Sequence, residues 1–199
     1  MTKPYADACD RNQEPIFSVI GPLFSDRKAV LEIGSGTGQH AVYFAKRLPK
    51  LIWYTSDLEE CHTGIKLWLE EADLANTRPP AILDVNQAIW PMLNVDAVFS
   101  ANTLHIFHWP EVKAMFRNVG KLLPMNGLFV VYGPFNYAGK YTSASNENFD
   151  QWLKARDLNS GIRDFEEINK LAESANMKLL DDYEMPANNR ILCWHKISN

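Results

Sequence analysis

The sequence predicts an α/β fold: a mostly parallel, seven-stranded β-sheet with helices on both faces and an antiparallel hairpin at the C-terminal end. Short apolar runs alternate with stretches in which apolar residues recur at helical spacing. A glycine-rich turn follows the first of these runs, and two later runs end at an aspartate. Strands that alternate with helices in this way are typical of parallel sheets that helices cover on both faces.

Seven runs of residues are the predicted strands. The first five are Ala29 to Ile33, Leu51 to Tyr54, Ala81 to Leu83, Ala97 to Ala101 and Leu128 to Tyr132. Lys178 to Met185 and Arg190 to Ile197 follow near the C-terminus, joined by a turn at residues 186–189. A hairpin there places one antiparallel strand in an otherwise parallel sheet, which distinguishes this fold from an all-parallel dinucleotide-binding fold.

Apolar residues at helical spacing predict the helices. The segments so marked are Ala41 to Leu48, Ile65 to Ala72, Val112 to Val119 and Asp164 to Ala175. Asp164 followed by Glu167 has the pattern of a capping box, in which two side chains bind the unpaired N–H groups at a helix start. A further helix is predicted from Asn12 to Phe24, with Pro15 in its first turn.

No repeat, low-complexity tract or flexible linker divides the chain, so a single domain over residues 1–199 is predicted. Within it, residues 1–28 are expected to form an N-terminal helical cover. Residues 137–160 are the least regular stretch, polar and aromatic, and are interpreted as a substrate loop beside the sheet edge.

Composition argues against several classes of protein. The net charge of −4 gives no overall attraction to nucleic acid or to anionic membranes, so neither is expected as a partner. The three cysteines, Cys9, Cys61 and Cys193, form no C-x-x-C pair, and no metal site is predicted. Neither a signal peptide nor a membrane-spanning run is recognisable, which leads us to expect a cytoplasmic protein.

The strongest chemical signal is the turn Gly34-Ser35-Gly36-Thr37-Gly38 between a predicted strand and a predicted helix. Glycine is needed where the backbone adopts positive φ or where a ligand approaches the main chain closely. The helix that follows offers unpaired N–H groups to a polar ligand. Dinucleotide-binding enzymes have G-x-G-x-x-G/A, but here Gln39 occupies the position of the third small residue. A phosphate-binding loop of the NTPase type is excluded because no G-K-S/T follows.

Two aspartates complete the predicted ligand site. Asp57 ends the second strand, 23 residues after Gly34 (57 − 34), near the offset at which an acid binds ribose hydroxyls. A carboxylate at that point can accept hydrogen bonds from both hydroxyls of a vicinal diol. Asp84 ends the third strand, at the edge where ligands of open α/β sheets bind, and could accept a hydrogen bond from an adenine amine.

Val30 to Gly38 resembles the first motif of class I methyltransferases that depend on S-adenosylmethionine (SAM), and the order of elements resembles that class over nearly the whole chain. In more detail, the chain resembles a small, poorly characterised family, the methyltransferase-like 26 type. The stretches that carry this second resemblance are Arg11 to Ile16, Gly34 to His40, Tyr132 to Phe135, Ser145-Asn146, Gly161 to Asp164 and Met185 to Asn189.

The resemblance implies a Rossmann-like methyltransferase fold and SAM as cofactor, with S-adenosylhomocysteine as its product and no metal. The residues that it implies around the methionine part of SAM are Glu32, Gly34, Ser35, Gly36, Thr37 and Gly38. By the same resemblance, Asp57 is expected at the ribose and Asp84 beside the adenine.

The segment Ser100 to His108 follows the fourth strand, at the sheet edge that faces the predicted methyl group. Methyl transfer needs mainly positioning and the exclusion of water, and it needs a base only when the acceptor is protonated. We predict His105 as that base and Asn102 as the residue that orients the acceptor. In the alternative interpretation, His105 packs against the following helix and satisfies a backbone group.

Six further residues are predicted to line the acceptor pocket: Arg11, Asn12, Tyr132, Asn136, Tyr137 and Asn188. Each also has a structural interpretation. The two N-terminal residues could cap a helix, the residues around the fifth strand could belong to the core, and the last could form a turn.

The predicted function is that of a SAM-dependent methyltransferase with a small-molecule acceptor, and a protein acceptor stays open. Two alternatives remain: a SAM-binding regulatory protein without catalysis, and an NAD-dependent oxidoreductase. Gln39 and the C-terminal hairpin argue against the oxidoreductase. The polar segment around Asn102 and His105 favours an enzyme over a regulatory protein.

Overall fold

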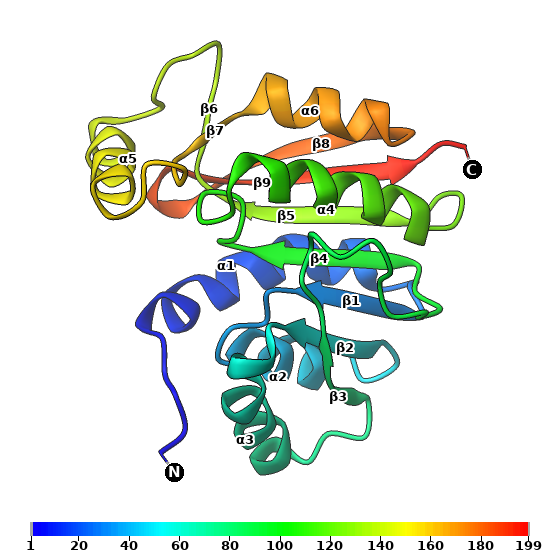
Figure 1. Ribbon diagram of the computed structural model, residues 1–199. Coiled ribbons are helices and arrows are strands. Elements are labelled where there is room, and N and C mark those ends of the chain that lie inside the picture. The colour runs from blue at the N-terminus through cyan, green and yellow to red at the C-terminus, as the bar shows by residue number, and fades with distance from the viewer. Residues whose placement is uncertain (1, 199) are drawn as a thin grey trace. The chain divides into compact units, whose positions relative to one another are not determined.

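A computed structural model describes residues 2–198 of the chain. The chain forms two compact units, the first ending at Ser100 and the second beginning at Ala101 (Figure 1). Within the described residues, no helix has the length and apolar character needed to cross a membrane.

The first unit alternates helices and strands. Its elements are α1 (Asp7–Phe24), β1 (Ala29–Ile33), α2 (Gln39–Arg47), β2 (Ile52–Asp57), the short 3-10 helix η1 (Glu59–Cys61), α3 (His62–Ala72), β3 (Thr77–Ile82) and β4 (Ala97–Ala101), whose last residue opens the second unit. β1 pairs in parallel with β2 and with β4, and β2 pairs in parallel with β3. All five residues of β1 are buried, as expected for a central strand that is covered on both faces.

Two predictions in the first unit need correction. α1 begins at Asp7 rather than at Asn12, so Pro15 lies inside the helix and not in its first turn. The first turns of α1 could not be predicted from apolar spacing, because the buried residues of this helix begin only at Ile16. β3 begins at Thr77 and includes two prolines, at 79 and 80. A strand tolerates them at the edge of a sheet, where β3 lies, because one side of an edge strand needs no N–H donors.

The second unit contains the remaining elements. They are α4 (Trp109–Leu122), β5 (Leu128–Gly133), β6 (Phe135–Asn136), α5 (Ala144–Arg156), β7 (Arg163–Asp164), α6 (Phe165–Ser174), β8 (Met177–Met185), the 3-10 helix η2 (Pro186–Asn188) and β9 (Asn189–Lys196). β9 runs antiparallel to both β5 and β8, and α6 packs against β8 and α4 (Figure 1). β6 and β7 form a separate, parallel pair that the sequence did not predict.

The main sheet has the strand order β3-β2-β1-β4-β5-β9-β8. This order confirms the predicted seven-stranded, mostly parallel sheet. The antiparallel strand is β9, which pairs with β5 on one side and forms the predicted hairpin with β8 on the other. The hairpin turn lies at η2, where the sequence placed it.

The predicted irregular stretch 137–160 is wrong in its middle, since residues 144–156 form α5. The buried residues of α5 are Asn146, Asp150 and Leu153, so the face that packs inward is mostly polar and produces no apolar periodicity. Ser143 begins the helix: its hydroxyl accepts a hydrogen bond from the Asn146 N–H at 3.1 Å.

The predicted capping box at the start of α6 is also wrong. Asp164 is the N-cap residue of this helix, but its side chain accepts no hydrogen bond from the helix backbone. A side-chain contact of this kind occurs at α4 instead, where the Glu111 carboxylate accepts a hydrogen bond from the His108 N–H at 2.6 Å.

Candidate cofactor and acceptor sites

The glycine loop of the first unit turns between β1 and α2 with three glycines at positive φ. These angles are 73° at Gly34, 57° at Gly36 and 92° at Gly38. A Cβ atom at Gly38 would lie 3.1 Å from the backbone Cα of Ile65, so a larger residue there would be crowded as well as strained at this φ. A Cβ at Gly36 would meet nothing within 4 Å. The loop therefore leaves open space in front of Gly36, as a backbone cradle for a ligand requires.

The loop and the end of β2 are joined through the predicted ribose acid. One carboxylate oxygen of Asp57 accepts a hydrogen bond from the Gly36 N–H at 2.7 Å, and the other accepts from the Leu58 N–H at 2.8 Å. Asp84 lies two residues beyond β3, and its carboxylate accepts a hydrogen bond from the Asn86 N–H at 2.9 Å. The Leu83 N–H donates to the Asp57 carbonyl at 3.0 Å, which brings both aspartates to the same edge of the sheet.

Glu32 lies beneath the loop and is 2% exposed. Its Oε2 atom accepts hydrogen bonds from the Ser35 hydroxyl at 2.9 Å and from the Trp53 indole N–H at 3.1 Å. Burial raises the pKa of Glu32 to about 7, against the opposing effect of these two donors. The predicted cofactor residues Glu32, Ser35, Gly36 and Asp57 are thus connected through one hydrogen-bonded loop.

Gln39 fixes the N-terminal segment to the glycine loop, a role that the sequence analysis missed. Its side-chain oxygen accepts hydrogen bonds from the Ala6 N–H at 2.6 Å and from the Thr37 hydroxyl at 3.0 Å. Asn12 makes a second connection, because its side-chain oxygen lies 2.7 Å from Nε2 of the buried His40. Burial lowers the pKa of His40 to about 4. Arg11 is exposed.

In the second unit, Asn102 and His105 approach the same point. A Cβ atom at Gly133 would lie 3.8 Å from His105 Nδ1 and 4.0 Å from Asn102 Oδ1. Asn102 adopts a positive φ of 58°, and its N–H donates to the Tyr132 carbonyl at 2.9 Å. The two polar side chains that the sequence singled out for catalysis are therefore neighbours above the end of β5.

The His105 ring is 6% exposed and lies edge-on to Phe149 of α5, with ring centres 5.3 Å apart. Within residues 2–198, no hydrogen bond involves the imidazole nitrogens. Burial, and then the charge of Arg163, lower the pKa of His105 to about 4. The imidazole is therefore neutral at physiological pH.

The other predicted substrate residues make structural contacts. The Tyr137 hydroxyl donates to Asp182 at 2.7 Å, and its ring stacks on Phe165. Asn188 lies in the hairpin turn, and its carbonyl accepts a hydrogen bond from the Asn146 side chain at 3.0 Å. Tyr132 is buried in β5, and Asn136 lies on β6.

Arg163 organises the segment that carries His105, a role that the sequence did not predict. Its guanidinium donates to the Leu104 carbonyl at 3.0 Å, to the Phe107 carbonyl, and to the Asn159 carbonyl at 2.8 Å. Arg163 lies in the stretch Gly161 to Asp164, which carries part of the family resemblance, and this is the feature of the sequence that could have indicated its importance.

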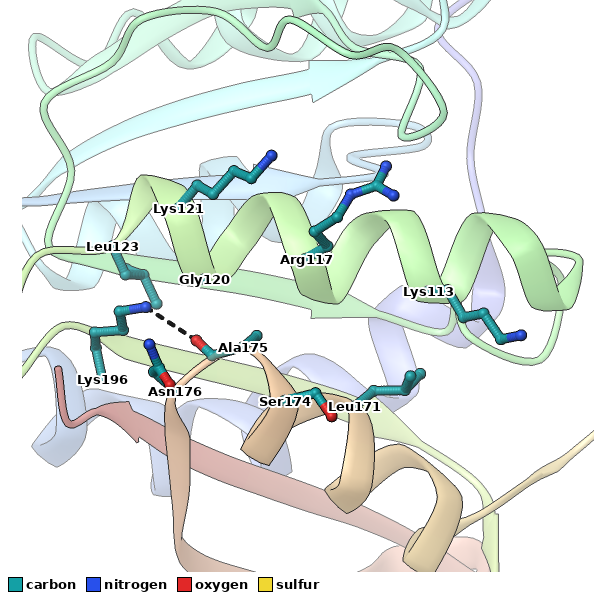
Figure 2. A pocket seen from close by; sticks show the side chains of 10 residues that line it. All are labelled: Lys113, Arg117, Gly120, Lys121, Leu123, Leu171, Ser174, Ala175, Asn176 and Lys196. Carbon is teal, nitrogen blue, oxygen red and sulfur yellow. Dashed lines mark hydrogen bonds between the residues drawn. The ribbon is translucent and has the colours of Figure 1, made fainter. Parts of the chain in front are cut away.

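A cavity of about 690 Å³ between α4 and α6 contains none of the predicted site residues (Figure 2). The Lys196 ammonium reaches its wall and donates to the Ala175 carbonyl at 2.9 Å, directly after the end of α6. A cation at a helix C-terminus satisfies an unpaired carbonyl there, which explains this buried lysine without a ligand. In the described part of the chain, no group of three or more His, Cys, Asp or Glu side chains could hold a metal ion.

Several solved structures with the same fold are methyltransferases by name. An O-methyltransferase family protein from Burkholderia thailandensis is 16% identical with a TM-score of 0.84, over 97% of this chain and 58% of that one. Mitomycin 7-O-methyltransferase is 16% identical with a TM-score of 0.83, over 95% of this chain and 54% of that one. Human N-acetylserotonin methyltransferase, in complex with SAM, is 14% identical with a TM-score of 0.80, over 96% of this chain and 53% of that one.

These likenesses establish the Rossmann-like methyltransferase fold, and this chain spans little more than half the length of each of those proteins. The model of one protein family matches residues 3–196, which is nearly the whole chain. The chain belongs to the family described as protein of unknown function (DUF938).

Proposed function

We propose that this protein is a SAM-dependent methyltransferase that transfers a methyl group to a small-molecule acceptor. The observation that carries the proposal is the glycine loop with its open space at Gly36, together with the Asp57 carboxylate 2.7 Å from the Gly36 N–H. Glycines with positive φ allow a ligand to approach the backbone, and a carboxylate beside them can accept hydrogen bonds from a ribose diol. The fold shared with methyltransferases of known name supports the same proposal.

In this proposal the first unit holds the cofactor. The loop from Gly34 to Gly38, with Glu32 beneath it, takes the methionine part, Asp57 the ribose and Asp84 the adenine. SAM supplies a methyl group on a sulfonium that is already activated for transfer. The resemblance to the methyltransferase-like 26 type is part of the same proposal and rests on the sequence stretches that carry it.

The second unit supplies the groups for the acceptor. Asn102 would orient it, and the neutral imidazole of His105 would take its proton. A base whose conjugate acid has a pKa of about 4 is weak, so it suits an acceptor that ionises readily. The O-methyltransferases among the fold neighbours favour a hydroxyl oxygen, and together these points favour an acidic hydroxyl such as a phenol.

Isothermal titration calorimetry with S-adenosylhomocysteine, and separately with NADH, tests the cofactor half of the proposal. We expect saturable binding of the first compound and none of the second. In a parallel thermal scan, a ligand at 100 times its Kd stabilises the protein by about 2.7 kcal/mol, or about 5–11 °C in Tm for a domain of this size. Binding of NADH without binding of S-adenosylhomocysteine would assign the loop to a dinucleotide and refute the proposal.

A further inference from the structure

The second unit contains a polar pocket of about 470 Å³ that the proposed methyl transfer does not use. The pair β6-β7 forms one side, and the starts of α4 and α6 and the end of α5 complete it. Trp109 and Tyr141 are its aromatic residues, and Asn136, Arg163, Asp164 and Glu167 are among its polar ones. Its volume lies in the range of small-molecule sites in proteins, which is roughly 300–1,000 Å³.

Two hydrogen-bond acceptors in this wall lack partners. The side-chain Oδ1 atoms of Asn136 and Asp164 are buried and have no hydrogen-bond partner among residues 2–198. They belong to facing positions of the β6-β7 pair, where Asn136 is in register with Asp164. Buried polar atoms in folded proteins almost always have a partner, so two orphans in one pocket wall indicate that something else supplies the donors.

The position of Asp164 makes its unpaired oxygen more informative. This residue is the N-cap of α6, where an aspartate normally accepts a hydrogen bond from the backbone of the helix start. Here the side chain makes no such bond and lines the pocket instead. Asp164 thus lacks the stabilising N-cap hydrogen bond, and its side-chain oxygen is an acceptor in the pocket wall.

The cations of the pocket are already engaged. Arg163 donates to three backbone carbonyls, and the Lys154 ammonium donates to the buried Asp150 carboxylate at 2.6 Å. The polar groups left for a ligand are therefore mainly acceptors: Asn136, Asp164 and the exposed carboxylate of Glu167. Lys154 is paired with Asp150, so the charges that remain are negative at Asp164 and Glu167 and positive at Arg163. The complementary ligand therefore has N–H donors and a positive charge.

We propose that this pocket binds a small organic cation through its N–H groups, as a primary ammonium or a guanidinium. The N–H groups donate to Asn136 and Asp164, and Tyr141 packs against the alkyl part, since the Trp109 ring already faces the Arg163 and Lys113 side chains. No residue assigned to SAM, and neither Asn102 nor His105, lines this pocket. Asn136, which the sequence predicted at the acceptor pocket, lines it and is here assigned to the cation instead.

The test is an NMR titration of the ¹⁵N-labelled protein with n-butylammonium and with ethylguanidinium, in the absence of SAM. Tetramethylammonium has the charge without N–H groups, and 1-butanol has the alkyl chain without the charge. We expect saturable shifts of the Trp109 indole N–H and of the backbone amides around Asn136 and Asp164. Both control compounds should bind at least about tenfold more weakly, since charge-assisted hydrogen bonds are lost.

Two variants complete the experiment. Asp164→Asn should weaken butylammonium binding by about tenfold, while Glu173→Gln, on the same helix but outside the pocket, should leave it unchanged. If Asp164→Asn does not fold, Glu167→Gln removes the exposed charge of the same pocket and should also weaken binding. Three results would overturn the proposal. They are equal binding of tetramethylammonium, full affinity for butylammonium in the folded pocket variants, and the absence of chemical-shift changes up to about 50 mM butylammonium, a concentration at which even weak binding with a Kd of about 1 mM would be saturated.

Discussion

The candidate cofactor loop of the first unit and the β6-β7 pocket of the second unit differ in how their polar groups are satisfied. In the first unit, Glu32 accepts two side-chain hydrogen bonds and Asp57 accepts two from the backbone, so the candidate cofactor loop is fixed by the chain itself. In the second unit, Asn136 and Asp164 each keep a buried oxygen without a partner among the described residues.

The difference separates what the fold needs from what a ligand must supply. A loop that binds a cofactor shared by a whole class of enzymes needs only glycines and acidic residues at a fixed spacing. Groups that recognise a particular acceptor or a particular cation remain unpaired until that molecule arrives, at a cost to stability. In the proposed function, the first unit binds the cofactor and the second unit determines which acceptor is recognised.

The largest expected effect tests the catalytic role assigned to the second unit. His105→Ala should reduce turnover of an acceptor by about 100- to 10,000-fold, the usual contribution of a positioned base, and leave the affinity for S-adenosylhomocysteine unchanged. His108→Ala is the matched control, because His108 is partly exposed and pairs with Asp157 at the surface. Unaltered turnover in the first variant would return His105 to a packing role.

The next prediction separates the two roles of glycine in the loop of the first unit. Gly38→Ala should lower the free energy of unfolding by more than Gly36→Ala, because its methyl group would press on the Ile65 backbone. Both variants carry the strain of a non-glycine residue at positive φ, about 1–3 kcal/mol. Gly36→Ala should instead weaken S-adenosylhomocysteine binding most, because its methyl group enters the open space. Chemical denaturation and calorimetry on both variants measure this, and equal effects would remove the distinction.

A pH-dependent effect is expected from Glu32. Its pKa is about 7 in the folded protein and near 4.5 when unfolded, so the folded state holds an extra proton between these values. Stability from this group is fully present below about pH 4.5 and is lost as pH rises through 7. Glu32→Gln should therefore stabilise the protein by up to about 3 kcal/mol at pH 8 and have little effect at pH 4.5. Urea denaturation at both pH values measures the difference, and an equal change at both would contradict the assigned cause.

The smallest expected effect concerns the surface of the second unit. Asp157→Asn removes the partner of His108, whose Nε2 lies 2.6 Å from the carboxylate, with both side chains more than 40% exposed. Exposed ion pairs contribute little, so stability should fall only slightly and the loss should shrink at high salt. A larger loss would mean that the segment around His108 depends on this contact more than its exposure indicates.

The sequence predicted the elements whose apolar periodicity is strong and missed those whose buried face is polar. β1 was placed to the residue because all five of its side chains are buried. α5 was not predicted because Asn146 and Asp150 occupy its buried face. β3 is longer than predicted, and its added residues include prolines 79 and 80, a residue type that is uncommon inside strands. An apolar pattern could not predict either element. The polar buried face of α5 depends on hydrogen-bond partners distant in sequence, and the prolines of β3 are tolerated because this strand lies at the sheet edge.

The same contrast holds for the candidate site. The glycine loop and Asp57 could be placed together because local spacing determines both. Arg163 and Gln39 could not, because each acts through backbone groups that only the folded chain brings within reach, such as the Leu104 carbonyl and the Ala6 N–H. The orphan oxygens of Asn136 and Asp164 are likewise a property of the packing.

The most direct test of the central claim is a two-dimensional NMR titration of the labelled protein with S-adenosylhomocysteine. If the first unit holds the cofactor, the largest shifts fall on the amides of Ser35 to Gly38 and on those next to Asp57 and Asp84. Asp57→Ala should weaken this binding by about 1.5–3 kcal/mol through loss of charge-assisted hydrogen bonds to the ribose. Shifts confined to other parts of the chain, or wild-type affinity in Asp57→Ala, would contradict the account.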